Sequence, residues 1–260
     1  MLVRARGTHQ QTLVLGIVLA LAALAWAVTF LLPGTPLASS LSHAHGAALE
    51  QSAHTPSIGV LGLFLVGWTV MTAAMMLPTA LPMVSTFARL ARSRPGAIGR
   101  VLLFVLGYLT AWTGFGIAAY TADLVVHHAV DASPFLASHT SLIGGGVLVL
   151  AGLYQFTPLK RRCLRQCRSA LSFLMAYWRE GPQGAWQMGA HHGIFCVGCC
   201  WALMLLMFGL GMLQLAWMLG LAWLMFVEKA VRGGERIAQL STLVLVLLGL
   251  LAVTGAGFWS

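Results

Sequence analysis

The sequence predicts an all-α, polytopic membrane protein: a transmembrane helical bundle of about seven helices that forms one integral membrane domain over residues 1–260. The first observation is the composition, with 59% apolar residues and only 8% charged residues, whereas a soluble domain carries about 25% charged residues. The second is that the apolar residues gather in runs long enough to cross a bilayer. The third is that the basic residues are confined to alternate connecting segments.

The composition also excludes several classes of protein. So few charges cannot cover a soluble globule, which excludes a cytosolic enzyme, a disordered chain and a nucleic-acid-binding domain. A net charge of +9 would suggest a polyanionic partner for a soluble protein. In a membrane protein, however, Lys and Arg mark the cytoplasmic ends of the helices. The lipid bilayer is therefore the predicted partner, and nucleic acid is not.

The predicted spans are the segments that approach the about 20 apolar residues needed to cross a bilayer. The fifth and sixth spans are short and nearly continuous around Gly209–Gly211, and we expect a helical hairpin there. A single helix over both spans would overshoot the bilayer by several turns. The seven predicted spans are 12–32, 58–80, 101–122, 141–157, 193–209, 211–228 and 239–259.

The basic residues set the predicted orientation. All 15 Lys and Arg residues lie in the N-terminal segment or after the second, fourth and sixth spans, and segments 33–57 and 123–140 contain none. Cytoplasmic loops carry the excess of Lys and Arg, so the N-terminus is predicted to be cytoplasmic. The apolar run Leu13–Leu32 exceeds the about 7–15 residues of a signal peptide's apolar region, so we expect an uncleaved anchor.

Three of the five cysteines lie close together at the start of the fifth span. Cys196, Cys199 and Cys200 have the spacing i, i+3, i+4, so they share one face of a helix, which Met204 continues. His191 and His192 lie five and four residues before Cys196. The plain alternative is that the thiols are buried as small hydrophobic groups. The sharper interpretation is a set of soft metal ligands.

A second group of sulfur atoms lies in span 58–80. Met71 and Met75 share a helical face, and Met76 is adjacent to it. Methionines often only fill gaps in a core, and this alternative stays open. Met75 and Met76 lie about 8–12 Å from the predicted inner boundary, at 1.5 Å per residue, which is a similar depth to that of the three cysteines. We therefore expect sulfur atoms from two non-neighbouring spans to meet if these helices pack together.

Residues 159–180 form a third candidate element, predicted to be a basic amphipathic helix at the cytoplasmic surface. Cys163 and Cys167 share one face of it, and the nearby arginines favour the thiolate form. They are interpreted either as buried anchoring residues or as a docking point where metal arrives or leaves. Glu228 and Lys229 close the sixth span, where we expect an interfacial ion pair.

The chemistry of these groups favours one metal. Thiolates and thioethers form a soft ligand set that selects Cu(I). Zinc is the alternative, because histidine could join the cysteines. No catalytic residue is predicted, and enzymatic activity is not expected. The candidate ligands are Met71, Met75, Met76, Cys196, Cys199, Cys200 and Met204, with Cys163, Cys167, His191 and His192 beside them.

Three segments together resemble a bacterial family of uncharacterised integral membrane proteins, described as predicted metal-binding and in some members labelled copper chaperone-like. The matching segments are Trp68–Pro78 (W-x-x-M-x-x-A-M-M-x-P), Tyr154–Cys167 and Cys196–Met204 (C-V-G-C-C-W-x-L-M), and Glu228–Lys229 follows. The resemblance covers about residues 58–232. It implies a membrane-embedded metal-binding domain.

The sequence therefore predicts a multi-pass protein of the bacterial inner membrane that binds Cu(I) for delivery, insertion or transport. A periplasmic copper protein or a membrane enzyme is the expected partner. Two alternatives remain open. In the first, the same thiols serve a membrane redox protein linked to quinone or haem. In the second, the chain is a small-solute transporter or structural subunit, and the Cys and Met side chains only fill space in its core.

Overall fold

The computed structural model describes residues 16–27, 58–94, 96–210, 215–231 and 233–253. Within these ranges the chain is helical and contains no strand, which confirms the all-α prediction. The first and last predicted spans, 12–32 and 239–259, lie partly outside the described residues.

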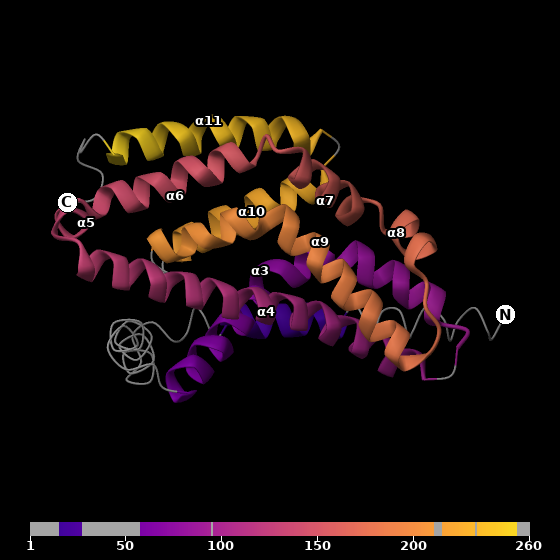
Figure 1. The fold of residues 1–260 in the computed structure, drawn as a ribbon. Coiled ribbons are helices and arrows are strands. Elements are labelled where there is room, and N and C mark those ends of the chain that lie inside the picture. Colours follow the sequence, from indigo (N-terminus) through magenta and orange to yellow (C-terminus); the bar gives the residue numbers. More distant parts are fainter. Residues whose placement is uncertain (1–15, 28–57, 95, 211–214, 232, 254–260) are drawn as a thin grey trace.

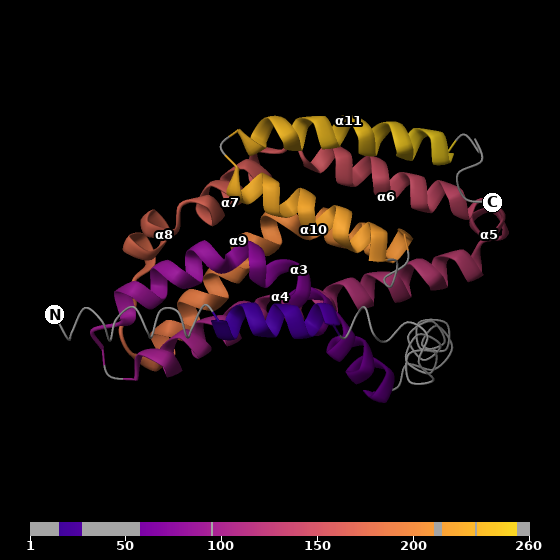
Figure 2. The same cartoon turned by 180° about the vertical axis from the view of Figure 1, so that it is seen from behind.

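Three long helices form the centre of the fold (Figures 1 and 2): α3 (Ile58–Ala91), α4 (Ala97–Ala132) and α9 (Gly181–Leu210). Helix α4 makes its most extensive contact with α9 and also contacts α3. Helix α11 runs beside α6 along the opposite side of the molecule. The remaining elements are α5 (Pro134–Ser138), α6 (Thr140–Tyr154), α7 (Pro158–Arg168), α8 (Ala170–Tyr177), α10 (Leu215–Ala230) and α11 (Gly234–Val253).

Glycines bring the backbones of α4 and α9 together. A Cβ atom at Gly107 would collide with the backbone carbonyl of Trp186, and one at Gly189 would collide with that of Phe104. Small residues permit such close approach of helices where no water separates them. This contact fixes the first turns of α9 against α4. It explains why α9 begins at Gly181, well before the predicted span start at residue 193.

A sharp bend separates α6 from α7. The two helices meet at 65°, because Pro158 cannot continue the helical hydrogen bonding of α6 but is well placed to begin a new helix. The side chain of Thr157 caps α7 by accepting a hydrogen bond from the backbone N–H of Lys160 at 3.3 Å. Segment 159–180 is therefore two helices, α7 and α8, separated at Ser169.

In the described part of the chain, three helices are long and apolar enough to cross a membrane, namely Leu61–Ala91, Ala97–Ala132 and Gly181–Met207. The bent pair α6 and α7 makes a fourth if it counts as one span. Among the described residues, the apolar helices Gly16–Ala27 and Leu240–Leu251 are shorter. The count of seven spans and the cytoplasmic N-terminus thus stay predictions. The predicted break near Gly209–Gly211 falls between α9, which ends at Leu210, and α10, which begins at Leu215.

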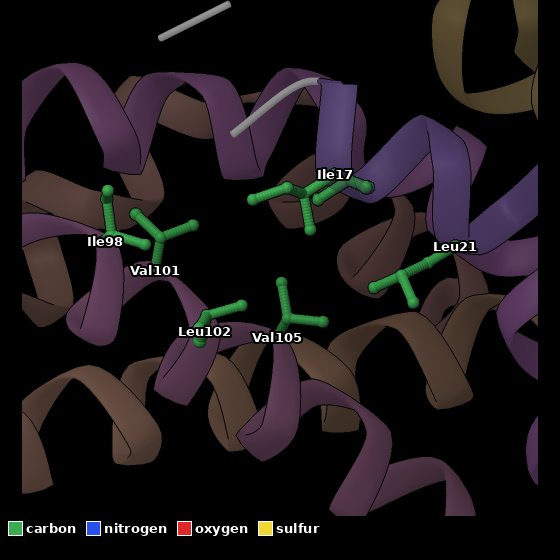
Figure 3. Close-up of a pocket in the computed structure, with 7 residues that line it drawn as sticks. Ile17, Leu21, Ile98, Val101, Leu102 and Val105 are labelled. Carbon is green, nitrogen blue, oxygen red and sulfur yellow. The ribbon is translucent and has the colours of Figure 1, made fainter. Parts of the chain in front are cut away.

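A small apolar cleft lies between the helix Gly16–Ala27 and α4 (Figure 3). Ile17 and Leu21 line one side, and Val101 and Val105 line the other. Its volume of about 10 Å³ is at the lower limit for one water molecule, and its lining side chains are all apolar. It offers nothing to a ligand, and the candidate site lies elsewhere.

Candidate metal centre

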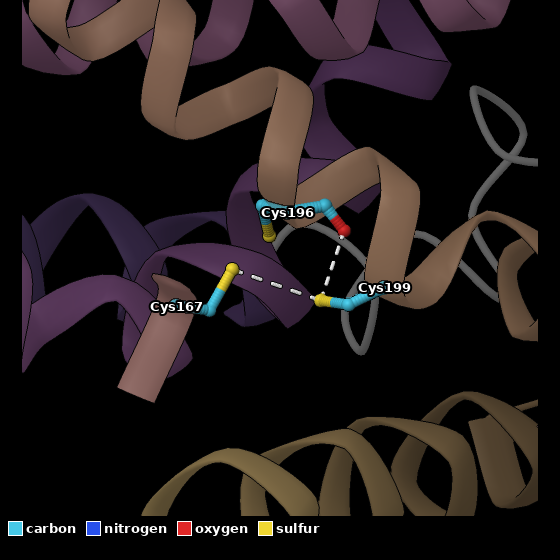
Figure 4. A group of neighbouring side chains, drawn as sticks. All are labelled: Cys167, Cys196 and Cys199. Carbon is cyan, nitrogen blue, oxygen red and sulfur yellow. Dashed lines mark hydrogen bonds between the residues drawn. The ribbon is translucent and has the colours of Figure 1, made fainter. Parts of the chain in front are cut away.

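Three cysteine sulfur atoms from two helices meet in the interior. Cys167 lies on α7, Cys196 and Cys199 lie on α9, and their Sγ atoms all lie within 4.8 Å of one another. The Sγ atoms of Cys167 and Cys199 are 3.8 Å apart, and the Cys199 thiol donates to the carbonyl of Cys196 at 3.2 Å. Figure 4 shows the three sulfur atoms turned toward one another. This cluster, called the thiol cluster below, could hold one metal ion.

Local sequence brings α7 onto α9. The spacing of Cys196 and Cys199 places both thiols on one helical face. Between them, Gly198 leaves room for α7, since a Cβ atom there would lie 2.6 Å from Cys163 Sγ. The hydroxyl of Tyr154, at the end of α6, donates to the Gly198 carbonyl. The bend after α6 and the glycine on α9 together carry Cys167 to its two partners.

The other two cysteines border the thiol cluster. Cys200 Sγ lies 3.3 Å from Cys199 Sγ and is buried. Cys163 is buried against Gly198, one turn before Cys167 on α7. All five cysteines are free thiols. The sequence prediction treated Cys167 as part of a separate docking point, whereas the structure joins it to the cysteines of α9.

A buried lysine touches the thiol cluster. The ammonium of Lys229, on α10, donates to Cys196 Sγ at 3.0 Å and to Thr79 Oγ1 at 3.0 Å. Its third contact is Met76 Sδ at 3.8 Å. A cation beside a thiol stabilises the thiolate, which is the form that binds metal. Lys229 therefore connects α3 and α10 to the thiol cluster.

An aromatic layer lies on the other side of Cys196. The hydroxyl of Tyr108, on α4, lies 3.0 Å from Cys196 Sγ. The ring of His192 stacks on that of Tyr108 with centroids 5.6 Å apart. His192 is buried, and its Nδ1 atom has no hydrogen-bond partner in the described part of the chain. His192 thus lies behind Tyr108, outside the group of atoms that could hold a metal.

The remaining predicted ligands are one histidine and four methionines. His191 lies among aromatic rings, 4.3 Å from the ring centroid of Tyr177 and 5.1 Å from that of Phe195. Met76 is connected to the thiol cluster through Lys229, whose ammonium contacts both Met76 Sδ and Cys196 Sγ. The ligand role of all four methionines stays a prediction, for Met76 as for the other three. Those methionines, buried in the same hydrophobic core as the cysteines, are Met71, Met75 and Met204.

A second buried polar group lies beside the thiol cluster. Lys160, on α7, donates to Glu228 Oε2 on α10 at 2.7 Å and also to Gln155 Oε1. Glu228 and Lys229 therefore do not form the interfacial ion pair that the sequence suggested. Glu228 faces α7, and Lys229 faces the thiols. Consecutive helical residues point in directions about 100° apart, so each reaches a different neighbour.

Sequence reasoning missed the roles of Tyr108, Lys160 and Lys229. Lys160 and Lys229 carried a usable signal, because charged residues are few in this chain and both adjoin apolar segments. An ionisable residue within an apolar segment of a membrane protein is a candidate functional group. Tyr108 carried no such signal, since tyrosine within an apolar helix is common in a hydrophobic core.

Comparison with known proteins agrees with this centre. A family model described as "PpoB2: Copper chaperone" matches residues 65–252, which is more than half of the chain. The chain matches none of the curated proteins and none of the solved structures with which it was compared. The matched range contains the thiol cluster, Tyr108, Lys160 and Lys229. The resemblance to copper chaperone-like proteins is confirmed, and the chain belongs to the PpoB2 copper chaperone family.

Proposed function

We propose that this protein is embedded in the bacterial inner membrane, binds Cu(I) through the thiol cluster and delivers it to a partner protein. The observation that carries this proposal is the meeting of three Sγ atoms within 4.8 Å, from two separate helices. Thiolates are soft ligands that suit both Cu(I) and zinc. The group that could hold a metal contains no imidazole, which favours copper over a cysteine–histidine zinc site.

The division of the ligands between α7 and α9 supports a site that releases its metal. Cys167 belongs to an 11-residue helix, whereas Cys196 and Cys199 belong to a 30-residue helix held against α4. A movement of α7 away from α9 would remove one ligand and leave two. A periplasmic copper protein or a membrane enzyme is the proposed recipient.

The test is the Cu(I) affinity of the purified full chain in detergent, measured without oxygen by competition with a chromogenic Cu(I) chelator. The wild-type protein is expected to bind one Cu(I) ion per chain. Replacing Cys167 with Ser is expected to weaken binding by more than about 100-fold, since the loss of a residue that only supports a ligand already costs about 10–100-fold. Replacing Cys199 with Ser is expected to have an effect of the same size.

Cys163→Ser is the matched control, because Cys163 lies on the same helix as Cys167 but outside the group of three thiols. This variant is expected to keep its Cu(I) affinity within about threefold, because no ligand is lost. Stoichiometric copper retained after Cys167, Cys196 and Cys199 are all changed to Ser would refute the site.

A thiol redox function is the second candidate, favoured by the 3.8 Å between the Sγ atoms of Cys167 and Cys199. A disulfide requires an S–S distance of about 2.0 Å, so a small closure of the α7–α9 gap would allow one. Counting alkylated thiols by mass spectrometry after cellular extraction separates the two functions. The copper function predicts that all five cysteines are found as free thiols. A disulfide between Cys167 and Cys199, or a haem absorption band, would support the redox function.

A further inference from the structure

The ammonium of Lys229 is held in a fixed position. An ammonium has three N–H donors, and Lys229 has an acceptor for each: Cys196 Sγ at 3.0 Å, Thr79 Oγ1 at 3.0 Å and Met76 Sδ at 3.8 Å. These acceptors come from α3 and α9, while the lysine itself comes from α10. Lys229 is only 9% exposed. Its charge therefore stays beside the thiol cluster and is poorly screened by water.

No carboxylate of the described residues pairs with Lys229. The adjacent Glu228 pairs with Lys160 at 2.7 Å, and these two opposite charges balance each other. The thiol cluster is thus left as the source of negative charge for Lys229. A metal ion that binds Cys196 enters a site that already holds one positive charge.

We infer that Lys229 is a specificity-determining residue, whose fixed positive charge makes the thiol cluster accept a monovalent ion, Cu(I), in preference to a divalent ion such as Zn(II). The inference rests on the proposed function, because it concerns the same thiols. An ion at about 2.3 Å from Cys196 Sγ would lie within about 5 Å of the ammonium. At a given distance the ammonium repels a dication twice as strongly as a monocation. The ammonium therefore disfavours the dication relative to the monocation whether two or three thiolates bind the metal.

The test compares Cu(I) and Zn(II) affinities of the purified full chain, each measured anaerobically by competition with a chelator for that metal. Loss of the ammonium also removes stabilisation of the thiolates, so both affinities can fall in a neutral variant. The ratio of the two affinities cancels this shared effect. In Lys229→Met and Lys229→Gln, the preference for Cu(I) over Zn(II) is expected to fall by about 10- to 100-fold, the size set by a unit charge at about 5 Å in a partly screened site.

Two controls separate charge from packing. Lys229→Arg keeps the positive charge and is expected to keep the ratio within about threefold of wild type. The double variant Lys160→Met with Glu228→Met removes the neighbouring buried ion pair as a neutral unit and is also expected to keep the ratio. The Gln variant retains a donor for Thr79, so it provides a neutral side chain even if the Met variant fails to fold.

Three results are decisive. A ratio unchanged in both neutral variants overturns the inference while the proposed copper function stands. A ratio that falls equally in the Arg variant overturns it as well, because packing and not charge would then set the preference. A wild-type protein that binds no Cu(I) refutes the proposed function itself, and the inference falls with it.

Discussion

Two polar groups lie 3.0 Å from the sulfur of Cys196, the hydroxyl of Tyr108 and the ammonium of Lys229. Hydrogen bonds to a ligand atom fix its orientation and adjust its affinity for metal. Tyr108 reaches the sulfur from α4 and Lys229 from α10. The thiol is therefore positioned by side chains from two other helices.

Tyr108→Phe tests this support. The change removes the hydroxyl but keeps the ring that stacks on His192. We expect the Cu(I) affinity to fall by about 10-fold, the low end of the effect of a residue that supports a ligand. Thermal unfolding in detergent should change little, since one partner of a weak thiol contact is lost. The readout is chelator competition on the purified chain.

Tyr120→Phe is the matched control on the same helix. The Tyr120 hydroxyl is buried and has no hydrogen-bond partner among the residues the structure describes. Its removal is expected to leave the Cu(I) affinity unchanged. Equal losses of affinity in the Tyr108 and Tyr120 variants would contradict the role given to Tyr108.

The residues of the site differ in how well the sequence predicts them. Spacing on a single helix predicts that Cys196, Cys199 and Cys200 share a face, because helical geometry is local. The participation of Cys167 depends on a 65° bend and on the packing of α7 against Gly198. Pro158 predicts that the helix breaks there, but no local pattern predicts how the two helices then pack. Lys229 was assigned to its sequence neighbour Glu228, but the tertiary contacts turn the two charges to different partners.

At the scale of elements, α7 is the part of the site that must be held in place. Lys160 joins it to Glu228 on α10, and the guanidinium of Arg168 donates to the carbonyl of Val231 at 2.5 Å. Both contacts tie α7 to the end of α10. The ion pair is buried, so removing one of its two members leaves the other as an unpaired buried charge.

Glu228→Gln is expected to lower the free energy of unfolding by about 3–5 kcal/mol, because the Lys160 ammonium loses its counter-charge. The measurement is unfolding of the purified protein in mixed detergent micelles. Replacing both members, Lys160→Met with Glu228→Met, is expected to recover most of that loss, since no buried charge is then left unpaired. A double variant as unstable as the single one would show that the pair itself stabilises the fold.

The α4–α9 contact offers a second test at this scale. Gly107→Ala places a methyl group against the backbone of Trp186, and we expect a destabilisation of about 1–3 kcal/mol from overpacking. Gly114 on the same helix has open space within 4 Å, so Gly114→Ala should be neutral or slightly stabilising. Unfolding of both variants under identical detergent conditions checks this. Equal behaviour of the two would contradict the close approach.

The sequence predicts where helices occur, because long apolar runs are a strong signal. It does not predict how long each helix is. Hydropathy placed the fifth span at 193–209, whereas α9 extends back to Gly181. Its first turns contain Gln183, Gln187 and histidines, which lower the hydropathy of the segment. They remain helical because glycines fit that stretch against α4. Tertiary packing, which a single sequence does not display, decides such boundaries.

At the scale of the whole molecule, the connections fall into two groups (Figure 1). The α3–α4 turn and the α7–α8 region lie toward one end of the helical bundle, and the α4–α5–α6 turn lies at the other. The first group carries arginines and lysines, and segment 123–140 carries none. This arrangement is what the excess of positive charge on the cytoplasmic side predicts.

Cysteine labelling tests that orientation. Ser93 follows α3 and Ser138 ends α5, and both are exposed. In intact spheroplasts, a membrane-impermeant maleimide is expected to label the Ser138→Cys variant and not Ser93→Cys, with the reverse pattern in inverted vesicles. The wild-type chain supplies the background signal of its own thiols. Labelling of Ser93→Cys from outside would reverse the predicted topology.

The central claim is that sulfur atoms of α7 and α9 together bind Cu(I). X-ray absorption at the copper edge, on the full chain loaded with one Cu(I) ion, tests it most directly. The account predicts a nearest shell of sulfur alone that loses scattering intensity in Cys167→Ser and keeps it in Cys163→Ser. A shell containing imidazole nitrogen, or one unchanged when Cys167, Cys196 and Cys199 are all replaced, would contradict it.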